Sequence, residues 1–399
     1  MDQSDKHHVV VIPSWYPPYG GSFFREHAMA LARYGQMDVT VLARHMPGLK
    51  NGPLRWLMPF QGKTVSKPEA GLTEKINWLR RIPLADKKNT ERWVNCIVAD
   101  FKRHLQHNPK PSLVQAQSSM WAGLAAAEIK KKWGVPYVLT EHRGRFVSGK
   151  DGNLLIMHWH RPLLHTAFSN ASHILTVSRS LQPGILEVVP EKATQMSVIP
   201  NMVDTSFFTP GAEESKNAKF TFLCIAHLER HKGLHTLIMA FADLAKSMVD
   251  SPQLIIAGDG SLGKELRTMV KDLGVEKQIT FKGKLDKTAI RELLWQSNAL
   301  VVASLFESFG VVIAEAMACG IPVVATPSGG PQEIITPQTG LVSESHDVCS
   351  LKNTLQHFME AYPGYDKETI RAYALDMFGQ KNTIQKYIAL YRQIIQSTP

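Results

Sequence analysis

The sequence predicts an α/β protein built from two doubly wound domains. Apolar strand-like runs alternate with helix-like periodic runs along all 399 residues. This alternation favours parallel sheets with helices on both faces. The series occurs twice, and a polar stretch at 201–219 with Pro210 and Gly211 separates the two occurrences. We therefore expect domains at 1–204 and 205–380, followed by a terminal helix at 381–399.

The first domain opens with a buried strand at 8–14 and a helix at 23–35, which we expect Gly35 to end. A helix at 119–134 carries three lysines in its last turn and ends on Gly134, which is typical of a helix C-terminus. Further strands are expected at 38–44, 112–117, 137–142 and 173–178.

Residues 45–92 interrupt the alternation. They hold four glycines and five prolines, so we expect a long, irregular, basic insertion. Within it, the stretch 75–88 interleaves tryptophan and aliphatic side chains with five basic ones. Two interpretations stay open. The stretch contacts an anionic membrane surface, or it forms an ordinary helix that packs its apolar side on the core.

The second domain repeats the alternation and ends in an amphipathic helix at 382–396. Its strands are expected at 220–226, 253–258, 278–283, 299–304 and 321–326.

A glycine-rich loop, "AGDGSLGKEL" (257–266), follows one of these strands. Gly258, Gly260 and Gly263 form a G-x-G-x-x-G pattern, which also occurs in the dinucleotide-binding loops of dehydrogenases. That fingerprint normally follows the first strand of its domain, whereas a strand and a helix precede this loop. We therefore favour a phosphate-proximal loop with another function over a dehydrogenase.

The net charge of +10 lies entirely in the first half. Residues 1–204 carry +11 and residues 205–399 carry −1. A basic half indicates an anionic partner, such as nucleic acid, acidic lipid headgroups or a phosphorylated substrate, and a solvated surface without a partner is the alternative. No aromatic-basic nucleic-acid module of a known type is present, so we expect no nucleic acid.

Other features of the chain indicate a cytoplasmic protein. Four scattered cysteines show no metal or disulfide spacing, and no run of 18 apolar residues occurs. The N-terminal residues do not have the pattern of a signal peptide. Attachment to the cytoplasmic face of a membrane stays open.

The strongest chemical pattern lies at 305–326. Glu307 follows a predicted strand in the loop that opens a helix, and Glu315 lies about two turns into that helix. Ligands of open α/β sheets bind at such strand ends, and the first amides of a helix favour a phosphate. The carboxylates suit sugar or ribose hydroxyls, and ordinary surface carboxylates are the alternative. The amides are those of Ser308, Phe309, Gly310 and Val311.

With "AMACGIPVVAT" (316–326) and "GGPQEI" (329–334), the Glu-x7-Glu pattern resembles the retaining glycosyltransferases of family 4, which have the GT-B fold. The resemblance implies two Rossmann-like domains facing a cleft, with the terminal helix packed back on the first domain. It implies transfer of a sugar from a nucleotide diphosphate-sugar to an acceptor bound by the first domain. The basic first half and the stretch 75–88 favour a glycan or lipid-linked acceptor, as in surface polysaccharide or glycoconjugate synthesis. Further similar segments lie at 20–35, 140–143, 198–204, 226–241 and 257–266.

The resemblance assigns donor-side roles in the second domain. Lys232 is expected to stabilise the diphosphate leaving group, and an exposed lysine at a helix start is the alternative. His227 stands where the family usually has an arginine, and Arg230 is expected to supply the missing charge. Glu307 is expected to position the transferred sugar without acting as a nucleophile, and Glu315 to contact the ribose. Gly258 and Gly260 are expected near the nucleotide.

Candidate residues of the first domain follow from the same resemblance. Gly20 and Gly21 would let backbone amides approach a phosphate or the acceptor, although a plain strand-to-helix turn also needs them. His142 is expected to face the donor sugar, and a satisfied core histidine is the alternative. Arg143 and Arg145 would bind an anionic group of the acceptor.

We expect no metal cofactor. The chain holds no Asp-x-Asp, and His158, His160 and His165 do not stack on one helical face. Lysine and helix dipoles would then stabilise the leaving group. Two other classes stay open: a nucleotide-sugar epimerase or hydrolase of the same fold, and a non-catalytic nucleotide-sugar-binding protein.

Overall fold

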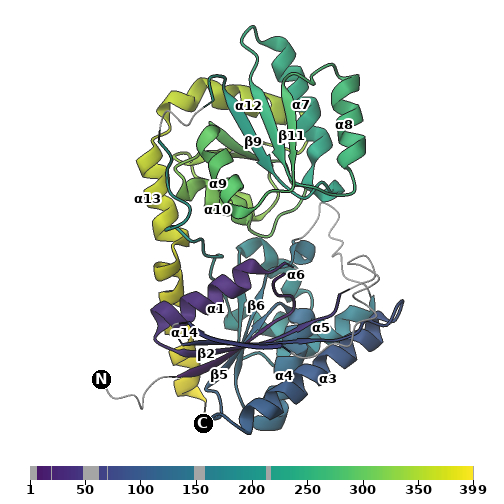
Figure 1. Cartoon of the computed structure of the whole chain (residues 1–399), viewed down its shortest axis with the longest axis vertical. Helices are drawn as coiled ribbons and strands as arrows, with labels where there is room; N and C mark the ends of the chain where they lie inside the picture. Colours follow the sequence, from purple (N-terminus) through teal and green to yellow (C-terminus); the bar gives the residue numbers. More distant parts are fainter. Residues whose placement is uncertain are drawn as a thin grey trace. The chain divides into compact units, whose positions relative to one another are not determined.

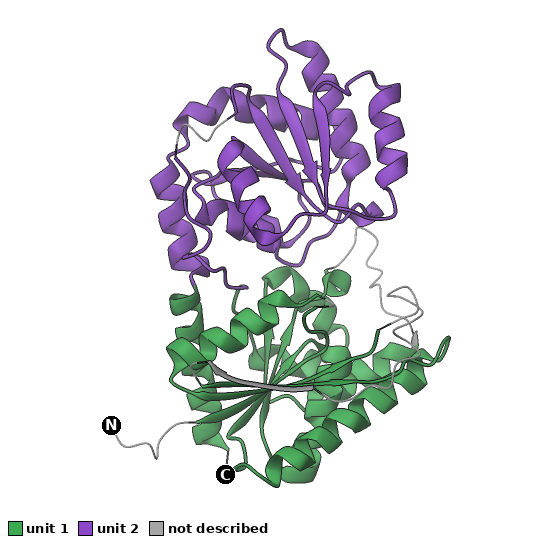
Figure 2. Cartoon of the chain, in the orientation of Figure 1, with its two compact units in different colours: residues 1–200, 380–399 green, residues 201–379 purple. Residues whose placement is uncertain are grey.

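The computed structural model describes residues 7–18, 20–47, 63–69, 71–147, 158–212 and 217–398. The chain divides into two compact units (Figure 2). Unit 1 comprises Met1–Pro200 with Gln380–Pro399, and unit 2 comprises Asn201–Gly379. Each unit is built around its own sheet of parallel strands, so the expected fold class is confirmed.

The sheet of unit 1 has eight strands in the order β3-β4-β2-β1-β5-β6-β7-β8. All neighbours are parallel except β3 and β4, which are antiparallel. The central strands are buried apolar runs because helices cover both faces (Figure 1). The strands are β1 His8–Pro13, β2 Asp38–His45, β3 Lys63–Glu69, β4 Leu72–Trp78, β5 Leu113–Gln117, β6 Tyr137–Glu141, β7 His173–Thr176 and β8 Met196–Val198.

The helices of unit 1 are α1 Ser22–Gly35, α3 Asp86–Leu105, α4 Leu124–Trp133, α5 Arg161–Ser169, α6 Gln182–Leu186 and α14 Gln380–Ser397. A π-helical turn, Ser119–Gly123, precedes α4, and Gly134 ends α4 with φ 67° as expected. Helix α1 ends at Gly35 as expected, and the left-handed residue is the next one. Gln36 adopts the left-handed conformation, with φ 51°.

The described part of 45–92 corrects two expectations. β3 and β4 extend the sheet there, so the insertion is not irregular throughout. The stretch 75–88 is not one helix, because it comprises the end of β4, a connection at 79–85 and the start of α3. Five of the nine glycines and prolines that suggested a loop lie at 48–62, outside the described residues.

The terminal helix α14 packs on α1 within unit 1. Tyr387, Ile388 and Tyr391 are among its buried side chains, and the Tyr391 hydroxyl donates a hydrogen bond to Gln115 Oε1 of β5. The last described residues of the chain therefore contribute to the core of unit 1.

The sheet of unit 2 has six parallel strands in the order β11-β10-β9-β12-β13-β14. They are β9 Thr221–Ile225, β10 Gln253–Ala257, β11 Ile279–Gly283, β12 Ala299–Val302, β13 Val323–Ala325 and β14 Gly340–Val342. The helices are α7 Leu234–Ser247, α8 Gly263–Asp272, α9 Lys287–Gln296, α10 Val311–Ala318, α11 Gly330–Ile334, α12 Val348–Ala361 and α13 Lys367–Phe378.

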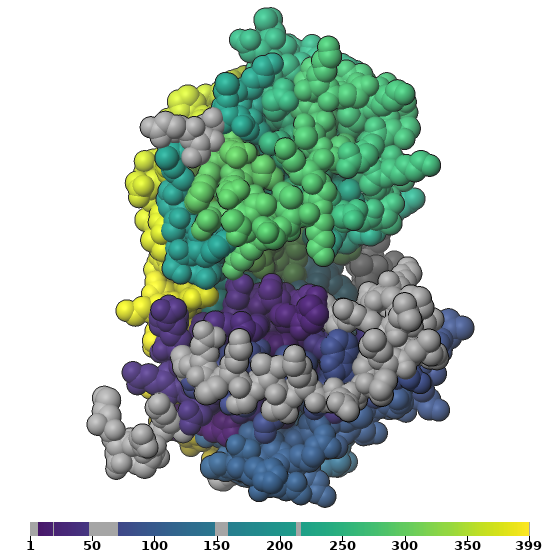
Figure 3. Space-filling model, viewed as in Figure 1, coloured from purple at the N-terminus to yellow at the C-terminus, as the bar shows by residue number. Residues whose placement is uncertain are grey.

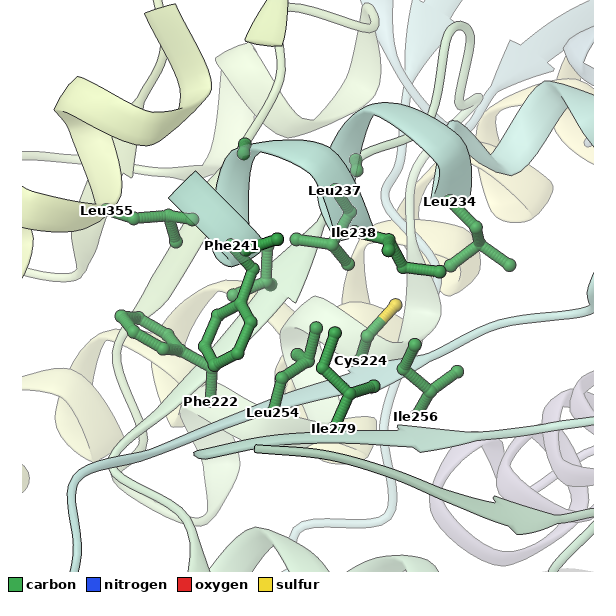
Figure 4. Packing of buried hydrophobic residues seen from close by; sticks show 14 of the residues in the cluster. Phe222, Cys224, Leu234, Leu237, Ile238, Phe241, Leu254, Ile256, Ile279 and Leu355 are labelled. Carbon is green, nitrogen blue, oxygen red and sulfur yellow. The ribbon is translucent and has the colours of Figure 1, made fainter. Parts of the chain in front are cut away.

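The core of unit 2 fixes where α7 begins. Leu234, Leu237 and Ile238 of this helix lie over apolar side chains of β9 and β10, including Cys224 and Ile256 (Figure 4). Leu234, the first residue of α7, is fully buried in this core. Residues 226–233 therefore form the connection from the carboxyl end of β9 to the helix.

Within the part of the chain that the structure describes, no helix is both long and apolar enough to cross a membrane.

Candidate active site

An ion pair lies at the carboxyl edge of the unit 2 sheet. Lys232 ends the short 3-10 turn Arg230–Lys232 after β9, and Glu307 lies in the loop after the neighbouring strand β12. Lys232 Nζ is 2.6 Å from Glu307 Oε2, and the two side chains are 19% and 17% exposed. Ser304 Oγ also donates to Glu307 Oε2, at 3.3 Å. The structure thus brings together two of the predicted site residues.

Close backbone packing holds Lys232 in place. Gly233 has φ 63°, and a Cβ there would lie 1.9 Å from the carbonyl oxygen of Ala303. The Leu305 amide donates to the His231 carbonyl at 2.8 Å, and the His231 ring stacks on Phe306 with centroids 5.3 Å apart. The loops after β9 and β12 are therefore tied to each other on both sides of the ion pair.

The loop after β13 also holds Glu307. The Glu307 amide donates to the Ser328 carbonyl at 2.7 Å, and the Gly330 amide donates to the Glu307 carbonyl at 2.9 Å. The position of this carboxylate therefore depends on three loops at one sheet edge.

The N-terminus of α10 lies directly after Glu307. Gly310 precedes the helix in the left-handed conformation, with φ 83°, and the first amides of a helix have no intrahelical partner. Phe309 can contact a ligand only through its backbone, because its buried ring packs on Phe378 with ring centroids 5.6 Å apart. Ser308 and Val311 are half-buried beside it. Glu315, one turn further along α10, is also half-buried.

The glycine-rich loop packs tightly on the loop after β9. A Cβ on Gly258 would lie 1.8 Å from the Ala226 carbonyl oxygen, and one on Gly260 would lie 2.6 Å from that of Leu228. The structure therefore requires both glycines for close approach of two loops. His227 and Arg230 are exposed on the same segment, where their charges can reach a ligand at this edge.

Unit 1 brings the double-glycine turn and His142 together. Gly20 and Gly21 have φ 94° and 74°, and a Cβ on Gly21 would lie 2.8 Å from the Trp15 carbonyl oxygen. Phe23 and Phe24, at the start of α1, lie with ring centroids 5.2 Å and 5.0 Å from that of His142. These glycines thus place the first turn of α1 against the histidine.

A buried polar chain orients His142. Its Nε2 donates to Gln117 Oε1 at 2.7 Å, and Gln117 Nε2 donates to His27 Nδ1 at 3.2 Å. Burial, with a smaller effect of His142, lowers the pKa of His27 to about 3. His27 therefore stays neutral and accepts the Gln117 amide, which keeps the Gln117 oxygen directed at His142.

Sequence reasoning missed Glu141, a buried carboxylate directly before His142. Its buried carboxylate accepts hydrogen bonds from Ser118 Oγ at 2.8 Å and from the amides of Ser119, His142 and Arg143 at 2.9 Å each. Burial alone raises the pKa of Glu141, but hydrogen bonds from Ser119 and the charge of Arg143 lower it overall. The only signal in the sequence is a carboxylate ending the apolar run "YVLTE".

Replacing Glu141 with glutamine should destabilise unit 1 by about 1–3 kcal/mol at pH 7, because buried donors lose a charged acceptor. The folded-state pKa is lowered, so the carboxylate stabilises the protein above its unfolded pKa of about 4.3. This contribution disappears as the pH falls through the folded-state pKa. The difference between wild type and variant should therefore shrink on acidification.

Urea unfolding followed by tryptophan fluorescence tests this, since seven of the eight tryptophans lie in unit 1. The exposed Glu91 on α3 provides the control Glu91→Gln. Equal losses for both variants at every pH would show that Glu141 has no special role.

Arg143 and Arg145 follow Glu141 and line a pocket of unit 1. The Arg143 guanidinium lies over the Trp15 ring, 4.7 Å from its centroid. Of the histidines considered as metal ligands, His160 lies beside Arg145 and His165 lies 3.9 Å from Glu191. Among the described residues, no group of three or more His, Cys, Asp or Glu side chains is arranged to hold a metal ion.

Comparisons with known proteins show the family to which this fold belongs. Residues 4–207 match the family model described as "Glycosyltransferase Family 4", and residues 208–374 match "Glycosyl transferases group 1". The chain belongs to glycosyltransferase family 4. It is a glycosyltransferase that uses a nucleotide-sugar donor, and the resemblance drawn from its sequence is confirmed.

Individual relatives share this description. A D-inositol 3-phosphate glycosyltransferase of Arthrobacter sp. (strain FB24) is 27% identical over 347 residues, covering 80% of each chain. The sucrose-phosphate synthase of Thermosynechococcus elongatus superposes with a TM-score of 0.78 at 21% identity, over 98% of this chain and 100% of that one. Anabaena HepE in complex with UDP gives a TM-score of 0.71 at 19% identity, over 97% and 100%. The two structures establish the GT-B fold.

Proposed function

We propose that the chain is a retaining glycosyltransferase in which unit 2 binds a nucleotide diphosphate-sugar and unit 1 binds the acceptor. The Lys232–Glu307 pair beside the start of α10 carries this proposal. A lysine and helix-start amides suit a diphosphate, and a carboxylate suits sugar hydroxyls. The complex of HepE with UDP supports a nucleoside diphosphate as part of the donor.

Donor binding would exchange partners within the ion pair. Without a ligand, Lys232 is neutralised by Glu307 at 2.6 Å. A diphosphate is the stronger partner for Lys232, and it leaves the Glu307 carboxylate to accept hydroxyls of the transferred sugar. Lys232 then stabilises the charge that develops on the departing diphosphate. His227 and Arg230 would add positive charge at the same edge, and Glu315 would bind the ribose.

Retention would proceed without an enzyme nucleophile. Glu307 is held by Ser304 and by its backbone hydrogen bonds to Ser328 and Gly330, which suits a positioning group. A phosphate oxygen of the donor would accept the proton of the attacking acceptor hydroxyl, and His142 would contact the donor sugar. NMR of the product should show a retained anomeric configuration. A sugar covalently attached to Glu307, detected by mass spectrometry of trapped enzyme, would contradict this mechanism.

Unit 1 would bind an anionic glycan or lipid-linked acceptor. It carries 29 lysine and arginine residues against 14 aspartate and glutamate residues. The name of the Arthrobacter relative, a D-inositol 3-phosphate glycosyltransferase, supports a phosphorylated acceptor. Arg143 and Arg145 are the candidate ligands for this charge. We propose no metal for the reaction.

The connection 79–85 and the start of α3 would contact an anionic membrane surface. Leu84 is fully exposed, and Arg80, Lys87 and Lys88 are exposed around it. Helix α3 is part of the blue surface of unit 1 in Figure 3. Flotation with anionic vesicles should show binding that salt weakens and that Lys87→Ala with Lys88→Ala reduces. Binding that ignores lipid charge and salt would contradict it.

Assays with a panel of nucleotide sugars test the proposed function. Release of nucleoside diphosphate should depend on an added acceptor and should yield a glycosylated product. Release of free sugar at full rate without any acceptor would favour a nucleotide-sugar hydrolase instead.

A further inference from the structure

A pocket in unit 1 combines positive charge with aromatic walls. It lies at the carboxyl ends of β2, β5 and β6 and at the start of α3, and its volume is about 180 Å³. Its cationic and titratable side chains are Arg81, Arg143, Arg145 and His160, and its aromatic side chains are Trp121 and Trp159.

Positive charge in this pocket exceeds negative charge. Among the described residues that line it, Asp86 is the one carboxylate, and it pairs with Arg81 at 2.6 Å. Glu141 lies close to Arg143, but its oxygens already accept four hydrogen bonds from the protein. Arg143 and Arg145 therefore have capacity for an additional anion.

Crowding of the cations supports the same conclusion. Arg143 and Arg145 lie together in the pocket, and Arg145 Nη1 donates a hydrogen bond to Nδ1 of a neutral His160 at 3.5 Å. Burial and the neighbouring Arg145 lower the pKa of Arg143 to about 10, and burial with Arg145 and Arg143 lowers that of His160. A bound anion would offset the repulsion between Arg143 and Arg145.

The aromatic walls contact neighbouring side chains. Trp121 Nε1 donates to Thr90 Oγ1 at 3.1 Å, and the Trp121 ring packs on Trp93 with centroids 5.5 Å apart. Trp159 packs on His160 with centroids 4.0 Å apart. Such rings favour the apolar faces of a sugar or polyol, or a hydrocarbon chain.

We propose that this pocket binds the acceptor through a phosphate ester, with Arg143 and Arg145 on the phosphate and Trp121 and Trp159 on the group esterified to it. Arginine forks match phosphate oxygens in bidentate geometry. The proposal rests on the proposed function, since it gives the chemical class of the acceptor in unit 1.

Calorimetric titration of the full chain tests the proposal with inorganic phosphate, glucose 1-phosphate and farnesyl phosphate as probes. We expect at least one ester to bind more tightly than inorganic phosphate. Arg143→Gln with Arg145→Gln should weaken ester binding at least about tenfold, and Arg145→Gln alone should weaken it without disturbing the Arg143 contact with Trp15. The exposed Arg33 on α1 gives the control Arg33→Gln, which should bind as the wild type does.

The two esters distinguish the source of the phosphate. Preference for glucose 1-phosphate indicates a soluble sugar or polyol phosphate, and preference for farnesyl phosphate indicates a lipid-linked one. Trp159→Ala should weaken the ester and leave inorganic phosphate unchanged. Failure of every phosphate probe to bind, or equal binding by wild type and the double arginine variant, would overturn the proposal.

Failure of the proposed function gives a different result. Nucleoside diphosphate binding at unit 2 should persist in the double arginine variant. If nucleotide binds and no ester does, only the present inference is wrong; if no nucleotide binds either, the proposed function is wrong.

Discussion

Replacing Lys232 with alanine should lower kcat/KM for sugar transfer by at least about 100-fold, because the departing diphosphate loses its nearest cation. The fold should survive, since the side chain is partly exposed and lies in the turn before α7 rather than in the core. Initial rates with the cognate donor and acceptor measure the effect. The exposed Lys246 at the end of the same helix gives the control Lys246→Ala, which should retain activity.

Because donor binding would exchange the partners of Lys232 and Glu307, replacing Glu307 should have a different effect from replacing Lys232. Glu307→Gln should impair transfer but keep or increase the affinity for free nucleoside diphosphate, because Lys232 loses a competing carboxylate 2.6 Å away. Lys232→Ala should weaken both. Equal loss of nucleoside diphosphate affinity in the two variants would show that the pair acts as one structural unit rather than as two groups with separate ligands.

Replacing Gly258 with alanine should destabilise unit 2 by more than about 3 kcal/mol. The new Cβ would lie 1.8 Å from the Ala226 carbonyl oxygen, and φ of 143° is unfavourable for any residue with a side chain. The loops after β9 and β10 would have to separate, which would also move the segment that carries His227 and Lys232. Calorimetric unfolding measures the loss.

Gly274 provides the matched control. It also has a positive φ, 67°, but a Cβ there meets nothing within 4 Å among the described residues. Gly274→Ala should therefore cost only the left-handed strain, about 1 kcal/mol. Equal losses for the two variants would mean that the loops relax easily and that Gly258 is not needed for their close approach.

The sequence predicted the fold well because the central strands are buried on both faces. Residues 9–13 and 299–303 are continuously apolar, which is typical of the strands of a buried parallel sheet. Strand β4 was not predicted, since its buried Glu74 breaks the apolar pattern. That carboxylate accepts from Tyr16 at 2.6 Å and pairs with Arg25 at 3.0 Å, partners that lie about 50 or more residues away and that no local pattern reveals.

The sequence named the candidate residues of the site, but it could not predict the contacts between them. The resemblance drew attention to Lys232 and Glu307, which are 75 residues apart. Their ion pair depends on β9 and β12 being neighbours, and sheet order does not follow from strand order along the chain. Glu141 was missed for a related reason: its four donors come from the ends of two different strands, and only the assembled edge of the sheet brings them together.

The most direct test of the account is a thermal-shift screen of the wild type against UDP, GDP, ADP, TDP and CMP, repeated with Lys232→Ala. A nucleotide at 100 times its Kd should stabilise the protein by about 2.7 kcal/mol. The account predicts that one nucleoside diphosphate stabilises the wild type and not the variant, which also identifies the base of the donor. No shift with any nucleotide, or the same shift in both proteins, would contradict a donor site built on Lys232.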